Sequence, residues 1–131
     1  MAGLVAANLV KNCRINSETY KSSGIALDFD AALLGDESVA AGASVQPIAG
    51  CTFTAAKLVF LYLLSDQDIT LTFTLGTGTL EIGLKAGFPW VWENTYEDTI
   101  PNPFEYDSVS CTAANEGTTA ATLAIRGGLD A

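Results

Sequence analysis

The sequence contains no histidine, and this absence removes the side chain most often used as a general base. Ser-His-Asp and Cys-His catalysis and zinc sites of the Cys/His type are therefore excluded. The chain also lacks a phosphate-binding glycine motif. Gly76 and Gly78 follow one expected strand and lead into another, so they predict a hairpin turn without the helix N-terminus that a phosphate loop needs. The chain is expected to be no enzyme and to carry no cofactor.

Cysteine is scarce, with three residues and no C-x-x-C pair. An odd number at wide spacing does not fit a disulfide framework, so Cys13, Cys51 and Cys111 are expected to be buried as small apolar side chains. The longest apolar run, residues 58–64, is too short to span a bilayer. The start, MAGLVAANLVKNCR, lacks the charged segment of a signal peptide. We therefore expect synthesis in a reducing cytoplasm and no membrane partner.

Basic residues are few, and they are unevenly placed. The net charge of −9 argues against a nucleic-acid partner, which needs clustered bases. Lys11, Arg14 and Lys21 face one acid in residues 1–21, giving +2, whereas three bases and fourteen acids give residues 22–131 a charge of −11. Residues 1–21 are expected to form an N-terminal arm or first strand that docks on a partner through these bases. A surface segment without a role explains the three bases equally well.

The clearest structural signal is β alternation. Apolar residues alternate with threonines through residues 68–75, which predicts a half-buried strand. Residues 58–64 are apolar on both faces, as in a central strand covered on each side. The polar residues 65–68 have the length of a hairpin connection, so the two strands are expected to pair as a hairpin.

Further strands are expected at residues 12–20, 24–30, 38–48, 79–85, 88–92, 108–113 and 118–126. Residues 31–34 fit a single helical turn, and Pro89 places its strand at a sheet edge because proline cannot donate to the ladder. The inward set of the last strand is expected to be Ala121, Leu123 and Ile125. About eight short strands with one apolar face each predict an all-β, antiparallel β-sandwich that is jelly-roll-like and occupies residues 22–131.

Acidic residues gather in one stretch without a base among them: Glu93, Glu97, Asp98, Glu105 and Asp107. A solvated loop is the favoured interpretation. The carboxylates are also weak calcium candidates, although no EF-hand spacing is present, and two of them would suffice for glycoside hydrolysis. Catalysis ranks last of the three.

Aromatic residues are mixed with these acids. Trp90 and Trp92 are two residues apart, so on a strand they share a face. Together with Tyr96 and Phe104 they are candidates for a subunit interface or for a surface on which sugar rings stack. Burial in the core or in an interface is favoured over sugar stacking.

The pattern of the last 75 residues resembles a known class of proteins. It rests on LYLLSDQDITLTF at residues 61–73, the strand at residues 87–92, the Asn-Pro-Phe turn at residues 102–104 and the ending SCTAANEGTTAATLAIRGGLD. In these features the chain resembles small β-sandwich structural proteins of tailed bacteriophage particles.

The resemblance implies a virion structural protein made in the host bacterial cytoplasm, most specifically a capsid decoration or head-stabilising subunit. A tail, fibre or tip component is the alternative. The implied partners are capsid or tail subunits and further copies of the chain, with a trimer as one form of the homo-oligomer. A carbohydrate-binding β-sandwich module is the alternative of another class.

Overall fold

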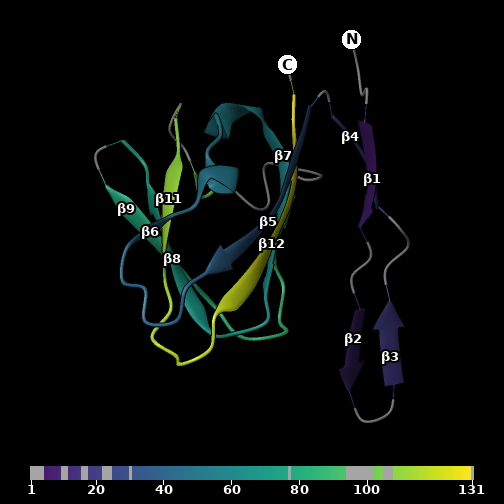
Figure 1. The fold of residues 1–131 in the computed structure, drawn as a ribbon. Helices are drawn as coiled ribbons and strands as arrows, with labels where there is room; N and C mark the ends of the chain where they lie inside the picture. The colour runs from purple at the N-terminus through teal and green to yellow at the C-terminus, as the bar shows by residue number, and fades with distance from the viewer. Residues whose placement is uncertain are drawn as a thin grey trace.

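The computed structural model describes residues 5–9, 12–15, 18–21, 25–29, 31–76, 78–93, 102–104 and 108–130, and the first four of these ranges as strands without their side chains. Within these ranges it contains twelve β-strands and two short 3-10 helices, η1 (Ala49–Cys51) and η2 (Ala55–Lys57). Eight of the strands form two four-stranded antiparallel sheets, ordered β10-β7-β12-β5 and β6-β11-β8-β9 (Figure 1). These strands are β5 (Ala31–Val39), β6 (Gln46–Pro47), β7 (Leu58–Ser65), β8 (Ile69–Thr74), β9 (Thr79–Leu84), β10 (Trp90–Glu93), β11 (Ser110–Ala114) and β12 (Ala121–Leu129).

The connectivity of the sandwich is that of a jelly roll. β5 pairs with β12, β6 with β11, β7 with β10 and β8 with β9, all antiparallel. The first half of the domain therefore runs back along the second half, and this double ribbon is folded over into two facing sheets. The predicted jelly-roll-like β-sandwich is confirmed.

The core lies between the sheets because each strand turns its apolar face inward. Burial alternates along β8, as its alternation of apolar residues with threonine predicts. The predicted inward set of β12 is confirmed, since Ala121, Leu123 and Ile125 are all buried. β10 is an edge strand that begins directly after Pro89, also as predicted.

The predicted hairpin of residues 58–64 and 68–75 is wrong, because β7 and β8 belong to different sheets. Both edges of β7 are occupied, by β10 and by β12, so β8 has no place beside it. Asp66, in the connection, extends the pairing with β12. Its backbone N–H donates to the Thr122 carbonyl at 3.3 Å, and its Oδ1 accepts the Thr122 N–H at 2.8 Å. The connection is thereby held to β12, and the chain crosses to the second sheet instead of turning back beside β7.

Two predictions for the first 50 residues also need correction. Residues 31–34 form no helical turn but begin β5, whose nine residues are held by pairing along the whole of β12. Residues 12–20 are not a single strand, since they span β2 (Asn12–Ile15) and the start of β3 (Glu18–Lys21). Local sequence leaves such short segments ambiguous, and partner strands far along the chain decide their structure.

The remaining strands form a long N-terminal hairpin, here called the arm. β1 (Val5–Leu9) pairs with β4 (Ile25–Phe29), and further out β2 pairs with β3. The register of the second pair differs by one residue from that of the first. β4 approaches β7 and β12, and Figure 1 shows β2 and β3 at the far end of the arm, away from the sandwich.

Candidate functional site

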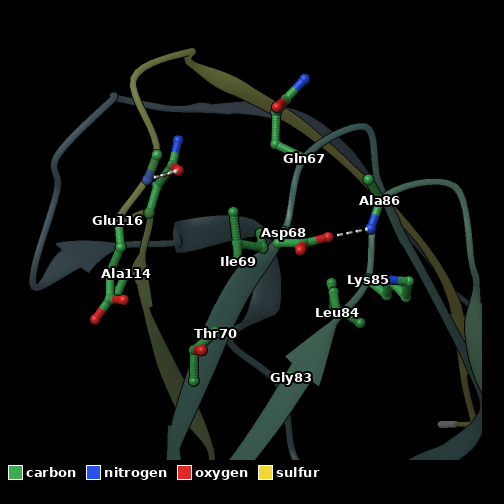
Figure 2. Close-up of a pocket in the computed structure, with 12 residues that line it drawn as sticks. Gln67, Asp68, Ile69, Thr70, Gly83, Leu84, Lys85, Ala86, Ala114 and Glu116 are labelled. Atoms are coloured by element: carbon green, nitrogen blue, oxygen red, sulfur yellow. Dashed lines mark hydrogen bonds between the residues drawn. The ribbon is translucent and has the colours of Figure 1, made fainter.

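An open hollow of about 840 Å³ lies at one end of the β6-β11-β8-β9 sheet (Figure 2). Its floor is a row of small residues, Ala114, Thr70 and Gly83, which are direct neighbours across β11, β8 and β9. Its walls come from three chain turns, at residues 67–68, 85–86 and 115–117. The hollow forms because the side chains of its floor are small and the three turns extend above them.

Hydrogen bonds fix two of these walls against each other. Asp68 Oδ1 accepts the Ala86 N–H at 2.8 Å, as Figure 2 shows. The buried Ser65 hydroxyl donates to the Gln67 carbonyl at 2.6 Å and accepts the Gln67 N–H at 3.2 Å. Gly87 completes the neighbouring turn with φ of +80°, a conformation that favours glycine. The hollow is therefore a preformed part of the surface.

Asn115 forms part of the third wall, and its side-chain amide makes hydrogen bonds within the protein. Its side chain is fully buried; Nδ2 donates to the Val39 and Thr119 carbonyls, at 3.3 and 2.9 Å. Its Oδ1 accepts the Gly117 N–H at 3.1 Å. Both N–H groups of this amide are therefore used within the protein, and the side chain serves to close the β11–β12 turn.

The lining offers little chemistry. Its ionisable side chains are Asp68, Lys85 and Glu116, and Figure 2 shows Gln67 extending away from the floor. The lining holds no cysteine or aromatic ring, so it has neither a thiol nucleophile nor a surface for sugar stacking. The arrangement of the lining residues suits a shallow contact made through polar side chains. Sequence reasoning missed this site because its walls are three separate turns that only the fold brings together.

The predicted aromatic surface is largely core. Trp92 and Phe104 are buried and Trp90 is half-buried. The Phe104 ring lies 5.3 Å from that of Phe53, 4.8 Å from that of Phe73 and 5.9 Å from that of Trp90, measured between centroids. The prediction that the two tryptophans share a face is confirmed by their common inward orientation, and burial removes Trp92 and Phe104 as sugar-stacking residues. Tyr96 lies outside the described residues.

The predicted acidic loop is represented by one residue. Glu93 is buried at the end of β10, whereas Glu97, Asp98, Glu105 and Asp107 lie outside the described residues. Among the residues that the structure does describe, no group of three or more acidic, cysteine or histidine side chains is placed to hold a metal ion.

The predicted docking bases fall on the far half of the arm. Arg14 lies on β2 and Lys21 on β3, and Lys11 lies outside the described residues. Arg14 is opposite Thr19 and Lys21 is opposite Asn12, so strand alternation places both bases on one face of this hairpin.

The cysteines of the sandwich follow the prediction, since Cys51 and Cys111 are free and buried. A hydrogen bond with Cys111, together with burial, raises the pKa of the Cys51 thiol above its ordinary value. This thiol is therefore a poor nucleophile at neutral pH. Cys13 lies on β2 in the arm.

In the described part of the chain, no helix combines the length and apolar character needed to cross a membrane. Comparisons with protein-family models, with curated proteins and with solved structures find no match to this chain.

Proposed function

We propose that the chain is a non-enzymatic structural subunit of a virus particle, specifically a capsid decoration or head-stabilising protein. The observation that carries the proposal is a jelly roll with a basic-tipped arm that reaches beyond the sandwich. Jelly rolls recur in viral capsid proteins and in lectins, and the fold alone does not choose between them. The arm favours the particle, since a projecting hairpin gives a small subunit reach onto a neighbour.

The far half of the arm has the chemistry for an acidic neighbour. Arg14 and Lys21 share one face there, and residues 1–21 carry +2 while the rest of the chain carries −11. Such a tip is attracted to an acidic shell surface and is held less strongly as salt rises. As a tail, fibre or tip component, the protein would make the same contact through its arm with a different particle protein.

Co-sedimentation tests this docking. The full chain is incubated with capsids purified from cells that make the particle without it, and Arg14→Glu/Lys21→Glu is compared with the unmodified protein. Reversing both charges is expected to weaken binding at least about tenfold, because attraction becomes repulsion at two positions. Tail assemblies are run in parallel to separate the head from the tail location.

Lys57→Glu, set beside Arg14→Glu alone, is the matched control, because it makes the same change of charge at an exposed sandwich residue outside the hollow. The control is expected to bind like the unmodified protein. Equal losses in Lys57→Glu and Arg14→Glu would mean that overall charge governs binding, and the arm would then have no specific docking role. Absence of binding to both heads and tails would refute the particle assignment.

A carbohydrate-binding module is the second candidate, favoured by the open hollow with its acid, hydroxyl and amine groups. If it holds, oligosaccharides bind with a measurable heat in titration calorimetry, and Glu116→Gln weakens that binding about tenfold, the cost of losing one charged hydrogen bond. Glu81→Gln, which makes the same change at an exposed residue outside the hollow, serves as the control. No heat across a panel of oligosaccharides would remove this candidate.

A further inference from the structure

The chain segment before β7 pairs with the β11 segment in a register that changes around η1. Two pairs flank η1, Pro47 with Thr112 before it and Phe53 with Val109 after it. Between these pairs lie residues 48–52 of the first segment but only residues 110–111 of the second. The three residues of η1 take up the difference, so η1 is inserted into the pairing opposite β11.

This insertion brings the last residue of η1 to Cys111. The Ile48 N–H donates to the Cys111 carbonyl at 2.9 Å, and the Cys51 N–H donates to the Ile48 carbonyl at 3.1 Å. Two hydrogen bonds thus connect the backbones of two cysteines that lie far apart in the sequence. Both side chains belong to the core between the sheets, where Cys51 is 0% exposed and Cys111 is 5% exposed.

The two thiols are also in contact, because a hydrogen bond joins the side chains of Cys51 and Cys111. A disulfide requires neighbouring backbones, side chains that point toward each other and a sulfur–sulfur bond of about 2.05 Å. The first two conditions are met in the folded chain. The bond therefore needs only a small approach of the two sulfur atoms.

We infer that Cys51 and Cys111 form an intramolecular disulfide when the protein meets a small-molecule disulfide such as oxidised glutathione. The free thiols of the structure are the reduced form, which a reducing cytoplasm maintains. The bond ties η1 to β11. It closes a loop that contains β7, β8, β9 and β10, which are four of the eight sandwich strands.

The exchange takes place in two steps. Cys111, the more exposed thiol, loses its proton and attacks one sulfur of oxidised glutathione, which releases a glutathione thiolate and leaves a mixed disulfide. Cys51 then loses its proton and attacks the Cys111 sulfur, so that the protein disulfide forms and the second glutathione thiolate leaves. The protein gives up two electrons and two protons, and one oxidised glutathione becomes two reduced glutathione molecules.

The surroundings of the pair set the order and the speed of these steps. The hydrogen bond with Cys111, together with burial, raises the pKa of the Cys51 thiol, so Cys51 is the poorer first nucleophile. In the second step Cys51 acts on a sulfur beside it, at a high effective concentration. Because both thiols are buried, glutathione reaches Cys111 when the chain opens locally or before folding is complete.

This cross-link goes beyond the proposed function and does not depend on it. A particle protein passes from a reducing cytoplasm to an oxidising exterior when it leaves the cell, and the bond then restrains the sandwich outside the cell. The same chemistry occurs in any oxidising solution. The purified protein therefore tests the cross-link whether or not the chain binds a particle.

Disulfide mapping of the full chain is the test. The reduced protein is unfolded in urea and refolded by dilution into oxidised and reduced glutathione, and free thiols are blocked before digestion with trypsin. Cleavage after lysine and arginine puts the three cysteines in separate peptides, residues 12–14, 22–57 and 86–126. The linked pair of 22–57 with 86–126 is expected to be at least about tenfold more abundant than the other two pairings together, because the fold holds this pair in contact.

The same chain kept in urea with the same glutathione mixture is the control for the fold, since loop length alone guides pairing there. Cys13→Ala is the matched control for the pair and is expected to keep the cross-link, whereas Cys111→Ala removes it. Oxidation is expected to raise the Tm of the unmodified protein and of Cys13→Ala by at least about 5 °C, because the bond restricts the unfolded chain. The Tm of Cys111→Ala is expected to stay unchanged.

Three results would overturn the inference. One is recovery of Cys51 and Cys111 as free or glutathione-bound thiols after refolding. Another is a linked pair that is no more abundant in the refolded protein than in urea. The third is an oxidised protein that melts no higher than the reduced one, which would show that the bond strains the fold. Circular dichroism checks the folding of each variant, and the mapping of the unmodified protein decides the matter if Cys111→Ala does not fold.

Discussion

Phe104→Ala is expected to lower the free energy of unfolding by about 3–5 kcal/mol, the largest stability effect of any single substitution considered. Phe104 is 0% exposed, and its ring packs against those of Phe53, Phe73 and Trp90. Truncation removes this aromatic packing and leaves a cavity that rigid neighbouring strands cannot fill. Urea denaturation followed by tryptophan fluorescence measures the change.

The position of Phe104 is itself fixed by hydrogen bonds. Asn102 Nδ2 donates to the Ala55 carbonyl at 2.9 Å, and Asn102 Oδ1 accepts the Phe104 N–H at 2.8 Å. Phe88→Ala is the control, since Phe88 is 63% exposed. Its truncation is expected to lower the free energy of unfolding by at most about 0.5 kcal/mol, as is usual at the surface. Similar losses for both substitutions would contradict the assignment of Phe104 to the core.

Asn115→Ala is expected to lower the free energy of unfolding by about 2–4 kcal/mol, because it breaks hydrogen bonds inside the protein. The fully buried amide joins the Val39 carbonyl of β5 to Thr119 and Gly117 in the turn before β12. Alanine leaves these backbone groups without the partner that satisfies them, at a position that water reaches poorly.

Chemical denaturation of Asn115→Ala beside Thr119→Ala checks this expectation. Thr119 lies in the same turn, but its side chain is exposed and the interaction with Asn115 uses its backbone carbonyl. The control therefore keeps the hydrogen bond and is expected to unfold close to the unmodified protein. A loss below about 1 kcal/mol in Asn115→Ala would show that other groups or water replace the amide.

The sequence indicated the strands whose own residues determine their orientation. β8 and β12 alternate between apolar and polar or small residues, and one inward face satisfies that alternation. The two-sheet architecture follows from the same local signal, because strands with one apolar face must close on another sheet.

The predictions from sequence were wrong where a partner far along the chain determines the structure. β7 and β8 are separated by a short polar connection, which is as compatible with a change of sheet as with a hairpin. Pairing of both edges of β7, with β10 and with β12, leaves only the change of sheet. The candidate site has the same origin. Residues 65–68, 86–87 and 114–117 lie between the expected strands, yet nothing local shows that these three connections surround one hollow.

The place of β12 in its sheet has a consequence for how the chain is made. β12 lies between β5 and β7, although residues 121–129 leave the ribosome after both of them. Until β12 is synthesised, β5 and β7 have no strand between them, and the edges that β12 will pair remain open to other chains. Productive folding is thus postponed until synthesis has passed residue 129, and nascent chains close together are exposed to mispairing during that interval.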